Sequence, residues 1–396
     1  MKYLWITWID PEPEHDGQRI YSGRLIDAVA AAGAEIDVLC FESAKSQRRN
    51  GMLEGPVRWW PIARANRPGW ASALSALPNM AYRCDTPAMR RMMRMLAAQG
   101  PWDTVVLDGL STAWALPILT RFSAMTHNRP QIVYISHNHE ESTRATIAEN
   151  YSGNRLAKAF LKYDAAKTRR LEHRAIEHAD LVTAITPEDA QLFKSRHPGK
   201  RIEVLSPGYA GQRVSERIIT STLPRRAVLV GSFEWIAKLM NLEEFLAVAD
   251  PLFAAAGAEI QVIGAGHPDA LTRMSQQLRA TTFLGSVPAV EPYLADARIA
   301  VVPERTGGGF KLKILDYVFN RLPVFAISGS VAGTPLRVPE NMLTFGSMED
   351  LGRGVIEMID DVPLLNRLQN TAYAACSNLF EWRQRGENFV AWTAAA

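Results

Sequence analysis

Cysteine is scarce in this sequence. Cys40, Cys84 and Cys376 are the only three among 396 residues, and they lie far apart. They provide neither a zinc-ligand spacing nor a disulfide framework, which is typical of a reducing compartment.

The sequence also lacks an uninterrupted apolar run of about 18 residues, the length that a membrane-spanning helix needs. The first residues, MKYLWITWID, reach Asp10 too early for a signal peptide. We therefore expect a cytoplasmic protein.

The composition is that of a globular protein with large packed cores. Hydrophobic residues make up 47% of the chain and charged residues 21%, which argues against disorder. A length of 396 residues favours two domains of about 200 residues each. Residues 1–205 carry 27 lysines and arginines against 22 acidic residues, whereas residues 206–396 carry 17 against 19. The basic first half suits anionic lipid or a pyrophosphate-bearing acceptor, and scatter in surface charge explains it equally well.

Short apolar runs alternate with helical patterns along most of the chain, which is typical of repeated β-α units around a parallel sheet. The strands predicted in the first half are Tyr3–Thr7, Glu35–Cys40, Val57–Ile62, Thr104–Leu107, Gln131–Ile135, Leu181–Ile185 and Ile202–Leu205. Those predicted in the second half are Ala227–Val230, Ile260–Ile263, Thr281–Leu284, Ile299–Val302 and Pro323–Ala326. The main helices expected are Ile20–Ala32, Pro87–Ala98 and Leu156–His178, with a helical tail over Leu351–Trp392.

The alternation stops at Ser206–Arg226, which has little apolar periodicity and contains two prolines and two glycines. This segment predicts an interdomain linker over residues 206–226. We therefore expect an N-terminal domain over 1–205, a C-terminal domain over 227–380, and a C-terminal helix within 381–396 that crosses back to the first domain. Ligands bind such doubly wound α/β sheets at the carboxyl ends of their strands, where backbone amides and helix N-termini are free.

The most informative segment is Ile299–Ala326, with the sequence IAVVPERTGGGFKLKILDYVFNRLPVFA. An apolar strand is followed by Gly307, Gly308 and Gly309 and then by a predicted helix over Phe310–Phe319. Glycines at a helix start leave backbone N–H groups unobstructed, and the helix dipole adds positive potential there. Lys311 and Lys313 in the first turn are unfavourable unless an anion is bound, which indicates a phosphate-bearing ligand. The alternative is a tight turn followed by solvated lysines.

At this point the sequence resembles a known family. The stretch GGGFKLKILDYVFNRLPVFA is similar to the donor-binding signature of GT-B glycosyltransferases of the retaining group 1 (family 4) type, in the polysaccharide and glycolipid sub-group. Further blocks with the family's order and spacing are VLVGSFEWIAKLMNLEEFL (Val228–Leu246), EIQVIGAGHPD (Glu259–Asp269), FLGSVPAVEPYLADARIAVVP (Phe283–Pro303) and, in the first half, ISHNHEEST (Ile135–Thr143). The resemblance implies two Rossmann-like domains facing each other across a cleft, with a nucleotide sugar held in the C-terminal one.

The resemblance also implies roles for residues of the signature. Asp316 stands where the family has a ribose-binding glutamate. Lys313 matches a lysine of the sub-group with a three-glycine loop, and with Lys311 it is expected to be catalytic, stabilising the departing diphosphate. The loop around Phe310 would contribute backbone amides to the same charge. Gly308 stands where many members have a first glutamate, which leaves the donor sugar open. Glu304, four residues earlier, is out of register and is not expected to replace it.

Other donor-binding candidates come from the remaining blocks. Ser232 replaces an arginine that many members direct at the diphosphate, so Lys238 is the nearest cation. Gly264 and Val287 belong to the blocks that follow the second and third strands of the C-terminal domain. Gly17 follows the first strand of the chain, where it would let the backbone approach the sugar phosphate. An ordinary helix N-cap explains the turn at Gly17 equally well.

His137 follows an apolar strand and is the catalytic candidate of the first domain, where it would orient the donor sugar or the acceptor hydroxyl. Its alternative role is a histidine satisfied by a backbone carbonyl. His139 and Glu140 are of zinc-ligand type, but a third ligand at a usable spacing is missing. We therefore expect neither a metal nor another cofactor.

Basic and aromatic residues interleave between the early strands of the chain. The members of this cluster are Arg48, Arg49, Trp59, Trp60, Arg64, Arg67 and Trp70. They suit peripheral contact with an anionic membrane on the inner face of the cell and a lipid-linked acceptor, and they equally suit an exposed loop that buries two tryptophans. No recognition motif accompanies the charge, so nucleic acid is not an expected partner.

Together these features predict a hexosyltransferase-like enzyme. It would move a sugar from a UDP- or GDP-sugar to an acceptor hydroxyl of a glycan or lipid-linked saccharide, and the resemblance implies retention. Two alternatives stay open. One is a non-catalytic donor-binding partner of a transferase complex, and the other is a different enzyme on the same architecture, such as a nucleotide-sugar epimerase.

Overall fold

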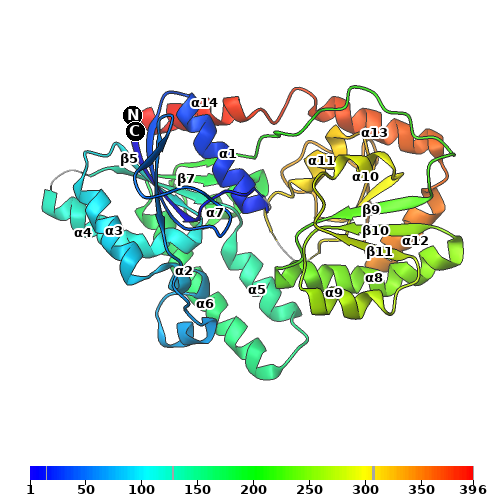
Figure 1. Ribbon diagram of the computed structural model, residues 1–396, viewed down its shortest axis with the longest axis horizontal. Helices are drawn as coiled ribbons and strands as arrows, with labels where there is room; N and C mark the ends of the chain where they lie inside the picture. Colours follow the sequence, from blue (N-terminus) through cyan, green and yellow to red (C-terminus); the bar gives the residue numbers. More distant parts are fainter. Residues whose placement is uncertain (15, 127–128, 306–307, 396) are drawn as a thin grey trace. The chain divides into compact units, whose positions relative to one another are not determined.

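The structure is a computed structural model that describes the chain except for residues 15, 127–128, 306–307 and 396. The chain folds into two compact units. The first comprises Met1–Gly208, Gly308–Phe310 and Glu381–Ala396, and the second comprises Tyr209–Gly307 and Lys311–Phe380. Each unit is built on one sheet covered by helices (Figure 1). None of the described helices is long and apolar enough to cross a membrane.

The first unit contains an eight-stranded sheet in the order β3-β4-β2-β1-β5-β6-β7-β8. The strands are β1 (Lys2–Ile9), β2 (Glu35–Phe41), β3 (Met52–Glu54), β4 (Val57–Ile62), β5 (Thr104–Asp108), β6 (Gln131–Ser136), β7 (Leu181–Ala184) and β8 (Ile202–Val204). Among these, β3 pairs antiparallel with β4 and the other pairs are parallel. Parallel neighbours need helical crossovers, which explains why helices follow the strands.

Ten helical segments accompany this sheet in the described part of the first unit. They are α1 (Gly17–Ala31), η1 (Gly69–Leu74), α2 (Asn79–Cys84), α3 (Pro87–Ala98), η2 (Leu110–Ala115), α4 (Leu116–Thr126), α5 (Glu140–Asn150), α6 (Arg155–His178), α7 (Pro187–Arg196) and α14 (Trp382–Ala394). Local signals set their starts. Thr86 and Thr186 each accept a hydrogen bond from a backbone N–H of the first turn, and a proline follows each of them as the first helical residue of α3 and α7.

The second unit contains a six-stranded parallel sheet in the order β11-β10-β9-β12-β13-β14. Its strands are β9 (Arg226–Val230), β10 (Glu259–Ile263), β11 (Thr281–Gly285), β12 (Ile299–Val302), β13 (Val324–Ile327) and β14 (Leu343–Phe345). Its helices are α8 (Ile236–Ala256), α9 (Pro268–Ser275), α10 (Glu291–Ala295), α11 (Lys313–Phe319), α12 (Met348–Met358) and α13 (Val362–Cys376). Figure 1 shows α8 and α11 on opposite faces of this sheet, which is therefore doubly wound.

The predicted α/β class and each predicted strand are confirmed, with ends that differ by at most two residues. Sequence reasoning missed β3 and β14, which have three residues each. The helix predicted over Phe310–Phe319 starts later, at Lys313. Lys311 therefore precedes α11 instead of lying in its first turn.

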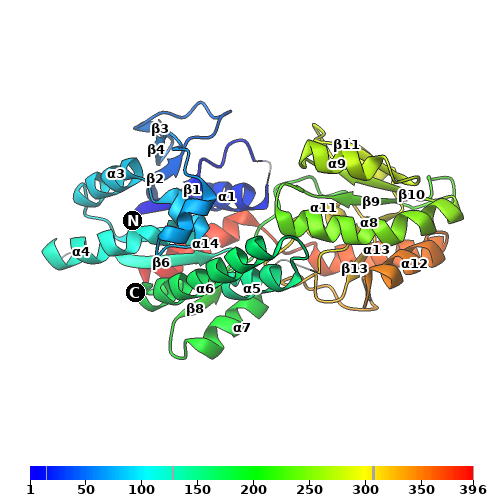
Figure 2. The same cartoon turned by 90° about the horizontal axis from the view of Figure 1, so that it is seen from below.

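The C-terminal helix α14 packs on the first unit, beside α1 (Figure 2). The rings of Trp5 on β1 and Phe389 on α14 lie 5.5 Å apart, and the hydroxyls of Tyr3 and Thr393 are 2.5 Å apart. The closest approach is at Gly386, where a Cβ atom would lie 2.1 Å from the carbonyl oxygen of Ala28 on α1. The two helices therefore touch backbone to backbone at this glycine.

The substitution Gly386→Ala should destabilise the first unit, because the added methyl group meets backbone atoms that cannot rotate away. We expect a loss of about 1–3 kcal/mol in the free energy of unfolding, measured by urea denaturation followed by circular dichroism. Gly346→Ala is the matched control, since its Cβ would have no neighbour within 4 Å. Equal stability of the two variants would contradict the close packing of α1 and α14.

Candidate active site

Three lysines of the second unit gather around one carboxylate. Glu304 follows β12, Lys311 lies two residues before α11, and Lys313 is the first residue of α11. Lys238 lies in the first turn of α8, which follows β9. Strands β9 and β12 are parallel neighbours, so their carboxyl ends open at the same edge of the sheet. The Glu304 carboxylate pairs with the Lys313 ammonium, and its other oxygen lies 3.9 Å from the Lys311 Nζ.

Glu304 is a charged group in a nearly dry environment. Its side chain is only 11% exposed, and those of Lys311 and Lys313 are 8% and 10% exposed. Burial alone would raise the pKa of Glu304, but the charges of Lys313, Lys311 and Lys238 outweigh burial and lower this pKa to about 2. Glu304 is therefore ionised throughout the physiological range.

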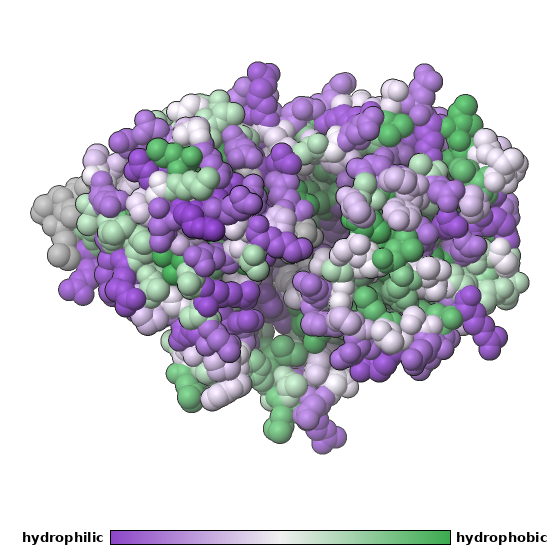
Figure 3. Space-filling model, viewed as in Figure 1, coloured by the Kyte–Doolittle hydropathy of each residue, from purple (hydrophilic) through white to green (hydrophobic). Residues whose placement is uncertain are grey.

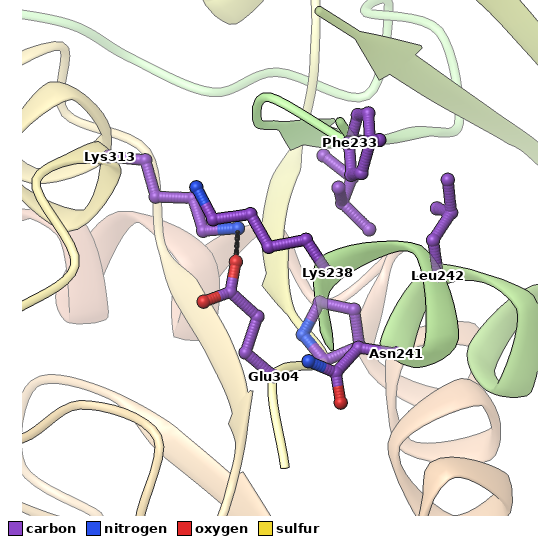
Figure 4. Close-up of a pocket in the computed structure, with 8 residues that line it drawn as sticks. Phe233, Lys238, Asn241, Leu242, Glu304 and Lys313 are labelled. Atoms are coloured by element: carbon purple, nitrogen blue, oxygen red, sulfur yellow. Dashed lines mark hydrogen bonds and ion pairs between the residues drawn. The ribbon is translucent and has the colours of Figure 1, made fainter. Parts of the chain in front are cut away.

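A small pocket lies beside this cluster, with about 170 Å³ of empty space including the part open to solvent. It is lined by Leu229, Phe233, Lys238, Asn241, Leu242, Pro303, Glu304 and Lys313. Figure 4 shows the Lys313 ammonium on the Glu304 carboxylate and the side chain of Lys238 reaching the same region from another element. The pocket thus presents ammonium groups on one side and apolar side chains on the other.

Asp316 lies one turn along α11 from Lys313 and is partly buried. Burial raises its pKa to about 7, and the charge of Glu291 on α10 adds to the shift, whereas a hydrogen bond from Tyr209 opposes it. The Tyr209 ring stacks on Phe319 at a centroid distance of 4.6 Å, which fixes the tyrosine beside Asp316. Asp316 can therefore change its protonation state near neutral pH.

The loop after β9 is packed against the loop after β10. Gly264 has a φ of +133°, and a Cβ atom there would lie 1.6 Å from the carbonyl oxygen of Gly231. Only glycine fits this position, so Gly264 shapes the loop that carries Ser232. Val287 lies half-buried in the loop between β11 and α10. The structure thus places Ser232, Gly264 and Val287 in loops at the carboxyl edge of one sheet.

The segment Gly308–Phe310 belongs to the first unit. A Cβ atom on Gly309 would lie 2.5 Å from both the carbonyl oxygen of His137 and the Oδ1 of Asn138, and one on Gly308 would lie 2.6 Å from the Thr143 Oγ1. Phe310 is 8% exposed. The glycines therefore allow a backbone approach that larger residues would obstruct. Gly307, the first glycine of the triplet, lies outside the described residues.

His137 of the first unit is held by a buried carboxylate. Its Nε2 lies 2.7 Å from Oδ1 of Asp108, and Oδ2 of Asp108 accepts a hydrogen bond of 3.0 Å from the Trp5 indole. The Tyr21 ring meets the imidazole edge to face at 5.2 Å. Asp108 is fully buried; burial would raise its pKa, but the hydrogen bond and charge of His137 hold that pKa below its usual range. His137 therefore pairs with the carboxylate of Asp108, whereas its alternative structural role predicted a backbone carbonyl as partner.

Gly17 is the first residue of α1, and Asp16 caps this helix by accepting a hydrogen bond of 3.0 Å from the Arg19 N–H. The structure thus supplies the N-cap that was the alternative explanation for this turn. A role of Gly17 in donor binding stays a prediction.

Two known protein families match the sequence of this chain. The family described as "Glycosyl transferase 4-like domain" matches residues 16–208, and the family described as "Glycosyl transferases group 1" matches residues 224–361. Between them the two matches span most of the chain. The chain belongs to the group 1 glycosyltransferases.

Solved structures similar to this transferase share the GT-B fold. Sucrose-phosphate synthase from Thermosynechococcus elongatus aligns with a TM-score of 0.74 at 16% identity, covering 100% of both chains. HepE from Anabaena, in complex with UDP-glucose, aligns with a TM-score of 0.67 at 13% identity, also over 100% of both chains. WaaG, a glycosyltransferase involved in lipopolysaccharide biosynthesis, aligns with a TM-score of 0.64 at 14% identity over 98% of this chain and 99% of its own. No curated protein matches the sequence significantly.

Sequence reasoning missed two carboxylates of the transferase. Asp108 was assigned no role, although it directly follows a predicted strand that pairs with the strand before His137. Glu304 is four residues out of register with the family signature, so the signature predicts no role for it. The signal for both was the placement of an acidic residue at the carboxyl end of a parallel strand, where it can meet the residue after the neighbouring strand.

A possible metal cluster was also not visible in the sequence. His139, Glu141 and Glu172 bring ligand-type atoms within 4.8 Å of one another. The carboxylate of Glu172 accepts the backbone N–H groups of Glu140 and Glu141, at 2.9 Å and 2.8 Å, so it caps α5. Burial and the charge of Glu140 raise the pKa of Glu172 to about 8. The cluster therefore serves the start of α5, and the expectation that no metal is needed stays a prediction.

The substitution Glu304→Gln should lower the free energy of unfolding at pH 7 by about 3 kcal/mol, because it leaves buried ammonium groups without their partner. A carboxyl with a depressed pKa stabilises the fold above its ordinary pKa of 4.5, and this contribution is lost as the pH falls towards 2. The stability difference between the two proteins should therefore shrink below pH 4.5, as measured by chemical denaturation at pH 7 and at about pH 3.5.

Glu244→Gln is the matched control for this variant. Glu244 also pairs with a cation, Arg305, at 3.3 Å, but both side chains are nearly half exposed. Such a surface pair contributes about 0–1 kcal/mol. A loss of stability in Glu304→Gln no larger than in this control would show that the buried ion pair has no structural importance.

Proposed function

We propose that this group 1 glycosyltransferase transfers a hexosyl group from a nucleoside diphosphate sugar to an acceptor hydroxyl of a glycan or lipid-linked saccharide, with retention of configuration. The observation that carries the proposal is the lysine cluster around Glu304. Three ammonium groups and one carboxylate leave a formal charge of +2. The diphosphate of a nucleotide sugar carries two negative charges, so the cluster suits it in charge.

Asp316 supports the nucleotide half of this assignment. It lies one turn from Lys313 on α11, and an ionised carboxylate there can accept hydrogen bonds from the two ribose hydroxyls. The HepE structures, which contain UDP or UDP-glucose, favour uridine over guanosine as the base. We therefore propose a UDP-sugar as the first donor to test.

The chemistry proposed for the lysines is stabilisation of the leaving group. As the glycosidic bond to the diphosphate breaks, the bonding electrons move to the departing oxygen, and preorganised ammonium groups lower the energy of that charge. Loss of one such donor typically costs about 3 kcal/mol of activation free energy. The lysines supply the positive charge that a metal ion would otherwise provide, so we propose a reaction without a metal.

His137 is proposed to orient the reacting sugar or the acceptor hydroxyl. Its hydrogen bond to the buried Asp108 fixes the imidazole ring, because the carboxylate is itself held by the Trp5 indole. A ring fixed in this way presents Nδ1 in one direction, which is what a positioning group requires.

Isothermal titration with UDP and GDP tests the proposed donor site. We expect micromolar binding of one nucleotide, and a loss of about 10- to 100-fold in affinity in Lys313→Ala, because a charge-assisted contact to the diphosphate is removed. Lys194→Ala is the control, since Lys194 is exposed on α7 of the first unit. If neither nucleotide binds, or if Lys313→Ala binds as well as the control, the donor site is wrongly placed. Donor binding without turnover on any saccharide acceptor would favour the non-catalytic alternative.

The affinity for UDP-glucose should rise with pH up to about pH 7 and level off above it. The pKa of Asp316 lies near 7 in the free protein, and hydrogen bonds from ribose stabilise its ionised form, so binding releases a proton below that pH. UDP-glucose serves as the ligand because its diphosphate does not titrate in this range. Titrations between pH 5.5 and pH 8.5 should show this rise for the native chain and a flat profile for Asp316→Asn. A rise that persists in Asp316→Asn would remove this residue from the site.

A further inference from the structure

The aromatic and basic cluster expected between the early strands is divided between the core and the surface. Trp59 is 2% exposed, and the Arg48 guanidinium stacks on its ring at 3.7 Å. Arg48 also pairs with Asp10 at 2.6 Å and with Glu54 at 2.8 Å. Arg48 and Trp59 are therefore internally satisfied, whereas Arg49, Arg64 and Trp70 are exposed, with 71% of Trp70 open to solvent.

A basic stripe instead runs along the solvent face of α6. It comprises Arg155, Lys158, Lys162, Arg169, Arg170 and Arg174. None of the six forms an ion pair with a described residue, and Lys158 donates a hydrogen bond to the backbone carbonyl of Glu149. Two of the three acids of α6, Asp164 and Glu172, are buried on the opposite face, which leaves Glu177 as the exposed acid of this helix. The positive charge of the stripe is therefore largely uncompensated.

Exposed apolar side chains border the basic stripe. Leu156 and Tyr163 on α6 are 80% and 48% exposed, and Trp70 and Leu74 on η1 are 71% and 89% exposed. Figure 3 shows apolar side chains along the lower edge of the molecule, over η1 and over the N-terminal end of α6. Single exposed apolar residues are ordinary, but large ones grouped beside a charged stripe indicate an interaction surface.

The two elements are joined side by side. Lys167 of α6 donates hydrogen bonds from its Nζ to the carbonyl oxygens of Ser72, at 2.7 Å, and Leu77, at 3.1 Å. Leu156 and Tyr163 precede Lys167 by eleven and four residues, so all three lie on one flank of the helix. Because Lys167 contacts η1, that flank adjoins η1. The four apolar side chains therefore lie on adjoining parts of one surface, and the basic stripe runs beside them.

We propose that the α6–η1 face, defined as the basic stripe together with Trp70, Leu74, Leu156 and Tyr163, binds the surface of an anionic lipid bilayer. Basic residues attract the phosphate groups of anionic lipids, while exposed tryptophan, tyrosine and leucine side chains insert at the level of the headgroups. A nucleic acid would satisfy the charges but would leave the projecting leucines in water. The combination of both kinds of side chain therefore fits a bilayer better.

Vesicle flotation with the full chain tests this proposal. The native protein should float with vesicles that contain about 30% phosphatidylglycerol in phosphatidylcholine, and not with pure phosphatidylcholine vesicles. Binding should weaken when the salt rises from about 50 mM to about 500 mM, because the Debye length shortens. The variant Arg155→Glu/Lys162→Glu/Arg169→Glu should lose roughly a hundredfold in partition coefficient, since each basic residue near the surface contributes about fivefold. Trp70→Ser/Leu74→Ser should weaken binding also at high salt, where the insertion of apolar groups remains.

The matched control is Arg273→Glu/Arg353→Glu/Arg367→Glu, which changes the net charge by the same amount on exposed residues of the second unit. It should float like the native protein. The proposal fails if the native chain does not bind anionic vesicles, or if both triple variants lose binding equally, because net charge alone would then be responsible. It also fails if a DNA duplex binds this face while vesicles do not. Circular dichroism of each variant checks that the fold is retained.

Discussion

The parallel order of the strands is the constraint on which both candidate sites depend. In a parallel sheet every strand ends at the same edge, so residues that follow neighbouring strands meet although they are far apart in sequence. Glu304 after β12 meets Lys238 beyond the carboxyl end of β9 in this way, across 66 positions of the chain. Asp108 at the end of β5 meets His137 just after β6 by the same rule. The sites are therefore a consequence of strand order.

Each unit uses a buried carboxylate to hold a nitrogen-bearing side chain. Asp108 fixes the ring of His137, and Glu304 gathers the ammonium groups of Lys311 and Lys313. Several ammonium groups in a space this poor in water would repel one another, and each would lose hydration. One carboxylate removes much of that cost and still leaves positive charge for an anionic ligand. This explains why an acidic residue stands within a site proposed for a diphosphate.

The sequence predicted the strands well because each is an apolar run bounded by turn residues, and a buried parallel strand requires this pattern. It predicted Lys311, Lys313 and Asp316 as site residues because they lie close together along one signature. It missed Glu304 because a signature compares positions along the chain. The ion pair between Glu304 and Lys313 depends instead on the path of the loop that joins β12 to α11. It placed the start of α11 three residues too early, because the ends of a helix are the part that a sequence pattern predicts least well. Residues that act through three-dimensional proximity are thus the ones that sequence patterns leave out.

The charge asymmetry of the chain has a structural origin that composition alone left undecided. Residues 1–205 have five more basic than acidic residues, and α6 (Arg155–His178) contributes seven lysines and arginines against three acidic residues. One helix therefore accounts for an excess of four, and scatter over the surface does not explain it. The acids of α6 that could neutralise this charge, Asp164 and Glu172, are turned inwards, where they bind backbone N–H groups of α2 and α5. The same contacts that anchor α6 to its unit thus leave its outer face basic.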